Sequence, residues 1–193
     1  MTNYFTNPVV FLIHTLCGLY ITLLLLRFIL QWAQVPFTNP VSQFVIKLTS
    51  PVLRPLRRVI PTYRGLDLST LVVAWLVKSL ELLLLTLVLT QLVPSFGVLL
   101  WSLPLLLRFV LQFFLFAVIA RAILSWVRPD PYHPLMIVLE RITSPILRPV
   151  QRRLPPIGGI DLSPMAVMIG LIVLDMLLLP PLLWLTATPL HLY

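Results

Sequence analysis

The stretch Thr49-Ser-Pro-Val-Leu-Arg-Pro55 recurs 94 residues later as Thr143-Ser-Pro-Ile-Leu-Arg-Pro149. The same offset superposes the two halves of the chain without a gap. It aligns Arg27-Phe-Ile-Leu-Gln-Trp32 with Arg121-Ala-Ile-Leu-Ser-Trp126, and Gly65-Leu-Asp-Leu-Ser69 with Gly159-Ile-Asp-Leu-Ser163. Ungapped identity in polar connecting segments is too specific for chance, so the sequence indicates an internal duplication.

The chain is too apolar for a soluble protein. Of its 193 residues, 59% are hydrophobic and 10% are charged, and the mean hydropathy is +1.01. Soluble domains are roughly 45–50% apolar and about 25% charged, so a water-soluble globule is excluded. We expect the formal net charge of +8 to set orientation in a membrane, and we expect no nucleic-acid partner.

Four stretches are long and apolar enough to cross a bilayer, whose core of about 30 Å needs roughly 20 helical residues. They cover about residues 9–30, 71–93, 98–124 and 165–187. The sequence therefore predicts an all-α membrane protein with four transmembrane helices. The duplication arranges them as two parallel tandem hairpin repeats, residues 1–97 and 98–193, and a four-helix bundle is the simplest product.

The basic residues predict the orientation. The two long connections, residues 31–70 and 125–164, each contain five Lys or Arg residues. The segment before the first span, the turn between the second and third spans, and the segment after the fourth span contain none. Because basic loops are retained in the cytoplasm, we expect both connections to be cytoplasmic and both termini to lie outside. We expect the first span to act as an uncleaved signal anchor.

Each long connection begins with an amphipathic pattern. Apolar residues recur at i, i+3, i+4 and i+7 after Pro40 and after Pro134, which predicts a short interfacial helix on the cytoplasmic side. The stripes are Val41, Phe44, Val45 and Leu48 in the first copy and Leu135, Val138, Leu139 and Ile142 in the second. Because a residue before proline disfavours helical geometry, we expect these helices to end near Thr49 and Thr143.

Arginines alternate with apolar residues and prolines after each of these helices. Such a segment suits the headgroup layer, where each arginine near anionic lipid contributes about 1 kcal/mol. Three interpretations stay open: the segment only enforces topology and packs on the helices, it contacts anionic phospholipid, or it docks a protein partner. The arginines concerned are Arg54, Arg57, Arg58, Arg148, Arg152 and Arg153.

Asp67 and Asp161 precede the spans that re-enter the membrane. An aspartate there caps a helix by accepting its free N–H groups. Each lies at the depth where Arg27 or Arg121 ends the preceding span. The sequence therefore predicts Arg27–Asp67 and Arg121–Asp161 contacts that close each hairpin; a ligand-binding role is the alternative.

Five ionisable residues lie well inside the spans: His14, Lys78, Glu81, Arg108 and Asp175. Intramembrane charges are unfavourable by at least about 2.5–3.5 kcal/mol each on insertion scales, so they should face other helices and pair. We expect Arg108 to pair with Glu81, Asp175 or both, with His14 as a neighbour and Lys78 facing Glu81 at i+3. The layer is either a structural polar lock or a path for protons or cations.

The chain lacks the patterns of catalysis. His14 and Cys17 form a lone pair without further metal or haem ligands, and there is no Gly-rich phosphate loop or His/Glu zinc motif. We therefore expect no catalytic residues, no cofactor, no metal site and no enzyme activity.

The repeated unit, with its R-x-I-L-x-W, T-S-P-x-L-R-P and G-x-D-L-S motifs, closely resembles the YggT (YlmG-like) family of membrane proteins. The resemblance covers nearly the whole chain. It implies an integral inner-membrane protein, usually with two such units in Gram-negative bacteria. Relatives are associated with osmotic-stress tolerance, with cell division and nucleoid distribution, and in plastids with cytochrome b6f assembly. The second copy departs mildly from the first at two positions. His133 stands where the first copy has Asn39, and Gln151 stands where it has Arg57.

Two functions follow as hypotheses. The first is a non-enzymatic scaffold or assembly factor, because the distinctive residues concentrate at the expected cytoplasmic surface. The second is a small ion or solute pathway linked to osmotic adaptation, which depends on the charges inside the spans. Expected partners are the bilayer with its anionic headgroups, another membrane protein or complex, and further copies of the chain.

Overall fold

The computed structural model describes residues 6–58, 60, 67–90, 96–127, 133–154 and 161–187. Within these ranges the regular structure is entirely helical. The helices are α1 (Thr6–Trp32), α2 (Pro40–Leu56), α3 (Leu68–Thr90), α4 (Gly97–Val127), α5 (Pro134–Gln151) and α6 (Ser163–Leu185).

Four of the helices are long and apolar enough to cross a membrane, which confirms the four expected spans. The qualifying segments are Asn7–Trp32, Leu68–Leu89, Gly97–Ser125 and Ser163–Leu185. Each lies within a few residues of the range expected from the sequence. Most of their side chains face outward, as lipid-facing side chains do, and Met176 and Leu177 of α6 are 69% and 65% exposed.

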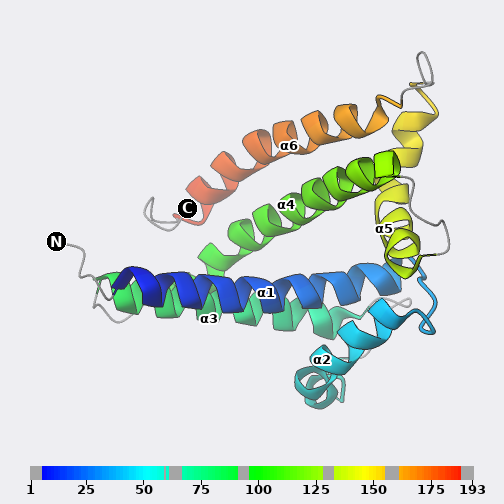
Figure 1. Cartoon of the computed structure of the whole chain (residues 1–193). Helices are drawn as coiled ribbons and strands as arrows, with labels where there is room; N and C mark the ends of the chain where they lie inside the picture. Colours follow the sequence, from blue (N-terminus) through cyan, green and yellow to red (C-terminus); the bar gives the residue numbers. More distant parts are fainter. Residues whose placement is uncertain are drawn as a thin grey trace.

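The spans form two antiparallel pairs, α1 with α3 and α4 with α6 (Figure 1). α1 begins, α6 ends and α3 passes into α4 at one end of the molecule, while α2 and α5 lie at the other end. Both connecting helices therefore lie at the same end of the molecule, as expected for two hairpins that run in the same direction.

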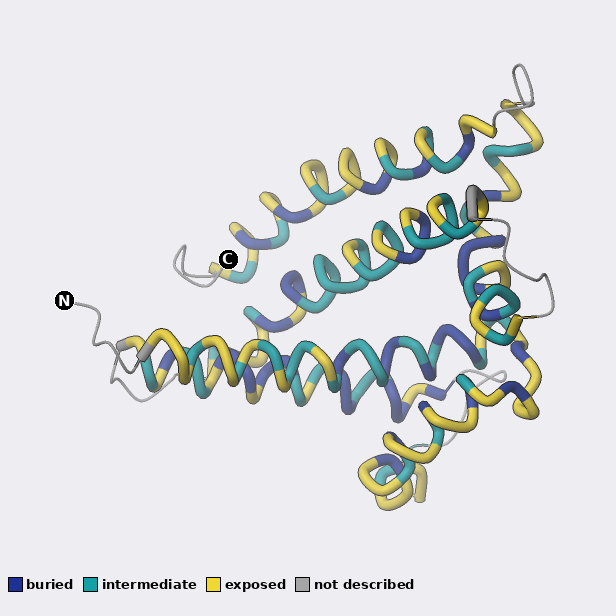
Figure 2. Tube along the Cα trace, in the orientation of Figure 1, coloured by how far each residue is buried: buried dark blue, intermediate teal, exposed yellow. Residues whose placement is uncertain are grey.

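The two hairpins pack against each other through α4. α4 packs on α3, and its Phe109, Phe113 and Ala117 share a core cluster with Ile21 and Leu25 of α1. α6 packs on α4 and α5. α5 contacts both α4 and α1 and separates the two hairpins at their common end (Figure 1). Its buried Val138 and Ile142 join a core cluster with Ile21, Leu25 and Ile29 of α1. Figure 2 shows buried stretches in both α1 and α5 near this end of the molecule.

Both connecting helices begin with the same cap. The Asn39 side chain accepts the N–H of Val41 at 2.9 Å, and His133 Nδ1 accepts the N–H of Leu135 at 3.3 Å. Proline follows in the first turn of each helix, where its missing N–H is harmless. The histidine of the second copy thus replaces the asparagine of the first in the same role.

The expected helix ends near Thr49 and Thr143 are wrong. α2 continues to Leu56 and α5 to Gln151, with prolines inside both helices. A proline in a helix interior is unfavourable by about 3 kcal/mol or more. Continuing buries Leu53 and Leu147 completely, and each fully buried leucine contributes about 1.5–3 kcal/mol. Packing against the spans, which periodicity alone does not include, offsets part of this cost.

Candidate functional site

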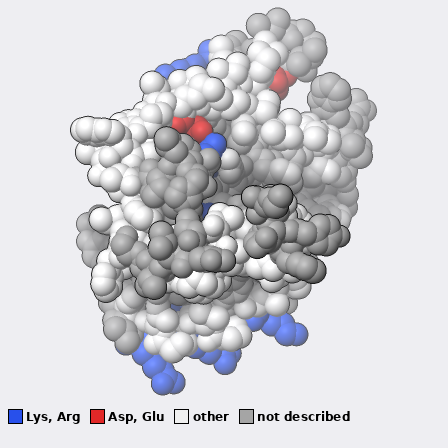
Figure 3. Space-filling model, turned by 90° about the vertical axis from the view of Figure 1, so that its left-hand side faces the viewer, with Lys and Arg blue, Asp and Glu red and all other residues white. Residues whose placement is uncertain are grey.

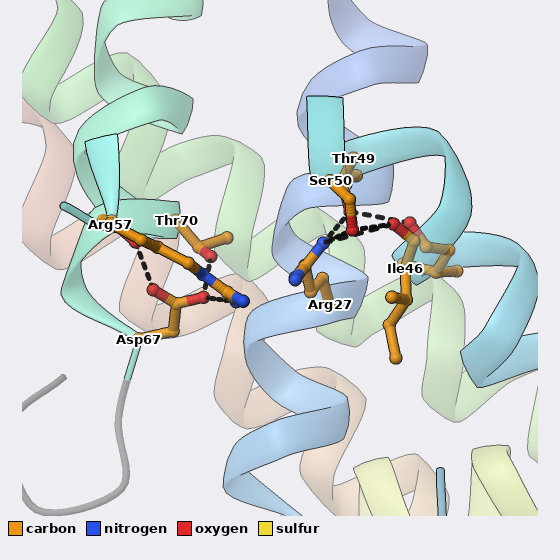
Figure 4. Close-up of polar contacts among 9 residues, drawn as sticks. Arg27, Ile46, Thr49, Ser50, Arg57, Asp67 and Thr70 are labelled. Carbon is orange, nitrogen blue, oxygen red and sulfur yellow. Dashed lines mark hydrogen bonds and ion pairs between the residues drawn. The ribbon is translucent and has the colours of Figure 1, made fainter. Parts of the chain in front are cut away.

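Arg27 joins the end of α1 to the middle of α2. Its Nη1 donates to Thr49 Oγ1 at 2.6 Å, to Ser50 Oγ at 3.2 Å and to the carbonyl oxygen of Ile46 at 3.4 Å (Figure 4). The residue is only 6% exposed. These acceptors are all neutral, so α2 binds a buried cation without a carboxylate.

The second half repeats this contact. Arg121 Nη1 donates to Thr143 Oγ1 at 2.7 Å. The expected direct Arg27–Asp67 and Arg121–Asp161 contacts are not formed. Thr49 and Thr143 lie on the buried sides of their helices and accept from the arginines, while Arg57 and Gln151 at the ends of the two helices contact the aspartates instead.

Asp67 is completely buried at the start of α3. Its carboxylate accepts hydrogen bonds from the Arg57 guanidinium, from the Ser69 hydroxyl and, at 2.8 Å, from the Thr70 hydroxyl (Figure 4). Burial raises the pKa of Asp67, but these donors outweigh burial and hold the pKa below its ordinary value. The end of α2 is thereby held to the start of α3 by an ion pair.

Asp161 makes the equivalent contact with an uncharged donor, the side chain of Gln151. Its carboxylate accepts from Gln151 Nε2 at 2.8 Å and from the N–H of Ser163 at 2.9 Å, at the start of α6. Slight burial raises its pKa, while the contacts from Ser163 and Gln151 and the charge of Arg121 lower it, and the net pKa is below the ordinary value. Gln151 stands where Arg57 stands in the first half, so the two closures differ in charge.

A polar cluster lies inside the first hairpin. Glu81 of α3 is 1% exposed and contacts His14 Nδ1 of α1 at 2.8 Å and Lys78 Nζ at 3.0 Å. Lys78 also lies 5.9 Å from the ring centre of Phe109 on α4. The expected Lys78–Glu81 pair and the His14 neighbour are therefore both present.

The expected pairing of Arg108 with Glu81 or Asp175 is wrong. Arg108 Nε and Asp175 Oδ1 are both buried, and within the described ranges neither atom has a hydrogen-bond partner. Lys78 supplies the cation for Glu81 from one turn earlier on the same helix. Asp175 instead lines a cavity of about 120 Å³ between α4 and α6.

The surface arginines are divided between two places. Arg54 and Lys47 line a groove of about 350 Å³ on α2, whereas Arg148, Arg152 and Trp32 line one of about 870 Å³ between α5 and the end of α1. Arg58 and Arg153 are exposed just beyond the two helices. Figure 3, seen from the end opposite α2 and α5, shows basic side chains mainly along the lower and upper edges of the outline.

Sequence reasoning missed one polar residue, Ser42. It lies on the buried side of α2 with Val45, Thr49 and Leu53, and its hydroxyl has no hydrogen-bond partner among the residues described. The signal was its position on the i, i+3, i+7 face, where an apolar residue is normally expected. No group of three or more His, Cys, Asp or Glu side chains in the described part of the chain is arranged to hold a metal ion.

Comparison with known proteins identifies relatives along nearly the whole chain. The CCB3/YggT family matches residues 6–88 and 100–182. The uncharacterised protein PA0392 of Pseudomonas aeruginosa is 39% identical over 182 residues, covering 93% of this chain and 92% of that protein. The uncharacterised protein YggT of Escherichia coli is 39% identical over 172 residues, 88% of each chain.

A third relative, an uncharacterised protein of Haemophilus influenzae, is 34% identical over 179 residues, covering 91% of this chain and 94% of the relative. No solved structure matches the chain. The two family matches, the identity over most of each relative and the four membrane-type helices lead to one conclusion. The chain belongs to the CCB3/YggT family.

Proposed function

We propose that this protein is a non-enzymatic scaffold or assembly factor of the bacterial inner membrane. It acts at the cytoplasmic membrane surface, in membrane-complex assembly, cell division or osmotic adaptation. Both termini are periplasmic, and α2 and α5 are cytoplasmic. The concentration of basic residues in the two long connections supports this orientation, as does the common end that α2 and α5 share.

The observation that carries the proposal is the surface of α2. Phe44, Leu48 and Val52 follow one another at i, i+4 and i+8 and are 59%, 43% and 43% exposed. Lys47 and Arg54 are exposed on another side of the same helix. A helix with one apolar and one basic exposed side lies in the plane of the membrane surface, with the apolar side toward acyl chains.

The two repeats have different roles in this proposal. The α5 residues that match Phe44 and Leu48 are Val138 and Ile142, which are 4% and 1% exposed because they pack against α1. The family matches at residues 6–88 and 100–182 have the same 94-residue offset as the motifs, which supports a duplicated unit. One copy of the connecting helix therefore braces the hairpins, and the other remains available to the membrane surface.

A partner-capture experiment tests the proposal. The tagged full-length protein is purified from membranes in mild detergent, and its companions are quantified by mass spectrometry. A stoichiometric companion should be retained by the wild type and by Arg54→Lys/Arg148→Lys, and lost from Arg54→Glu/Arg148→Glu. The lysine variant is the matched control because it keeps both charges. A wild type without any stoichiometric companion, including a second copy of itself, would contradict scaffolding.

The buried pair of Lys78 and Glu81, which the exposed His14 contacts, favours a second candidate, an ion pathway. Ionisable residues at membrane depth often mark proton or cation routes. Reconstituted protein should then conduct protons or cations, and Glu81→Gln should abolish the flux. If the wild type shows no flux but does retain a companion, the ion pathway is contradicted and the cluster has a structural role.

A further inference from the structure

A cavity of about 530 Å³ lies between the end of α1 and α2. This volume falls within the roughly 300–1,000 Å³ typical of ligand pockets. Its lining is part apolar and part polar. The apolar residues are Leu30, Val35, Phe37, Ile46 and Ile60, and the polar ones are Arg27, Gln31, Ser42 and Arg57.

The charges around this cavity do not balance. Arg27 and Arg57 both line it, but the only ion pair that either makes with a described carboxylate is Arg57 with Asp67. Among the described residues, Arg27 is buried and donates to hydroxyl and carbonyl oxygens, and Asp67 acts on it electrostatically without a direct contact. A buried guanidinium without a counter-ion is unfavourable, and a phosphate is the anion that its planar fork fits best.

Ser42 provides an independent observation. It is 2% exposed, lines the same cavity, and its Oγ has no hydrogen-bond partner in the described part of the protein. Buried hydroxyls are nearly always hydrogen-bonded. An acceptor oxygen bound in the cavity would give the Ser42 hydroxyl a hydrogen-bond partner.

The second repeat shows that the fold does not require these polar residues. At the positions of Ser42, Ile46 and Arg57 it has Met136, Glu140 and Gln151. The arginine that matches Arg27 is retained as Arg121. The second repeat thus lacks the hydroxyl and one cation and gains an acid, so an anion site made by these residues would be confined to the first repeat.

We propose that this cavity binds the phosphodiester headgroup of one anionic phospholipid of the phosphatidylglycerol class. Arg27 and Arg57 hold the phosphate, the Ser42 hydroxyl donates to one of its oxygens, and the apolar walls contact the first part of the acyl chains. The inference rests on the placement of α2 at the bilayer surface proposed above. A zwitterionic lipid is disfavoured because its ammonium group would face two guanidinium groups.

Native mass spectrometry of the delipidated full-length protein tests this. Titration with dioleoyl-phosphatidylglycerol should give one retained lipid, with dioleoyl-phosphatidylcholine at least about tenfold weaker. Arg57→Gln and Ser42→Met, which copy the second repeat, should each weaken phosphatidylglycerol binding by about tenfold, as expected for one lost hydrogen bond to a charged group. Arg58→Gln removes the same charge from the next residue, outside the cavity, and should retain binding.

Folding of the variants is checked by thermal melting. Gln151 binds Asp161 in the second repeat, so glutamine at position 57 is expected to keep the contact with Asp67. Equal losses in Arg57→Gln and Arg58→Gln, or equal binding of the two lipids, would overturn the proposal. Displacement of the lipid by millimolar glycerol phosphate would overturn it too, since the ligand would then be a soluble phosphate. None of these outcomes depends on the partner-capture experiment with Arg54→Glu/Arg148→Glu. The scaffold proposal can therefore fail or hold independently of the lipid proposal.

Discussion

Arg57 pairs with the completely buried carboxylate of Asp67 and thereby fixes the end of α2 to the start of α3. In the second half, Gln151 makes the corresponding contact with Asp161. The same junction is thus closed once by an ion pair and once by a neutral hydrogen bond. Because Asp161 is exposed and Asp67 is buried, the two junctions should respond differently to substitution and to pH.

Asp67→Ala should lower the free energy of unfolding by about 1–3 kcal/mol, because the donors that it satisfies lose a buried acceptor. The value is expected near the lower end, since Arg57 is 39% exposed and water replaces part of its contact. Thermal or denaturant unfolding in detergent measures the change. Asp161→Ala is the matched control with the smaller expected loss, and a larger loss there would contradict this ranking.

The first junction should also weaken in acid. The pKa of Asp67 is lower in the folded protein than in the unfolded chain, where it is about 3.9. The stability that this carboxylate contributes is therefore fully present above about pH 4 and is lost as the pH falls through the lower folded pKa. Melting temperatures measured between pH 6 and about pH 3 should fall less steeply for Asp67→Asn than for the wild type. Parallel curves would refute the assignment.

Lys78 and Glu81 should behave as one unit inside the first hairpin. Removing one partner of a buried ion pair is unfavourable by about 3–5 kcal/mol, so Lys78→Met and Glu81→Leu should each destabilise strongly. The double variant should be more stable than the sum of the single effects predicts, because it leaves no unpaired charge. A double-mutant cycle in detergent measures this coupling. Strict additivity would show that the two side chains do not interact.

Arg108→Leu should destabilise the protein less than Lys78→Met. Arg108 has a buried Nε without a hydrogen-bond partner among the described residues, so its removal leaves no established pair broken. Melting of the two single variants side by side is sufficient. A greater loss for Arg108→Leu would restore the Arg108-centred lock that the sequence predicts.

Pro51→Ala should leave the protein equally stable or stabilise it by up to about 3 kcal/mol. α2 passes through Pro51, and alanine removes both the steric conflict and the missing N–H of an interior proline. Unfolding and the far-ultraviolet dichroism of the variant report the effect. A clear loss of stability would instead place the end of α2 before the proline.

Much of the fold could be predicted from the sequence because it depends on local composition. Span length follows from bilayer thickness, and the Lys78–Glu81 pair follows from helical spacing. The partners of Arg27 and Arg121 could not be predicted in the same way. They depend on how α2 and α5 pack against α1 and α4, which brings Thr49 and Thr143 to the two arginines.

The candidate ligand cavity could not be predicted for a related reason. Ser42, Arg27 and Arg57 are separated along the chain and meet only after α2 folds back along α1. Repeat symmetry was also misleading for Arg108, since its counterpart His14 contacts Glu81 while Arg108 does not contact Asp175. The two halves share these backbone junctions and differ in the contacts of their charged side chains.

The most direct test of the account is cysteine accessibility in intact cells. Single cysteines replace Phe96, Arg54 or Arg148 in a Cys17→Ser background, and a membrane-impermeant maleimide is added from the periplasmic side. Phe96, which is 93% exposed at the end opposite α2 and α5, should be labelled at once. The positions of Arg54 and Arg148 should be labelled only after the inner membrane is opened. Labelling of either arginine position in intact cells would contradict an inner-membrane protein with both connecting helices on the cytoplasmic surface.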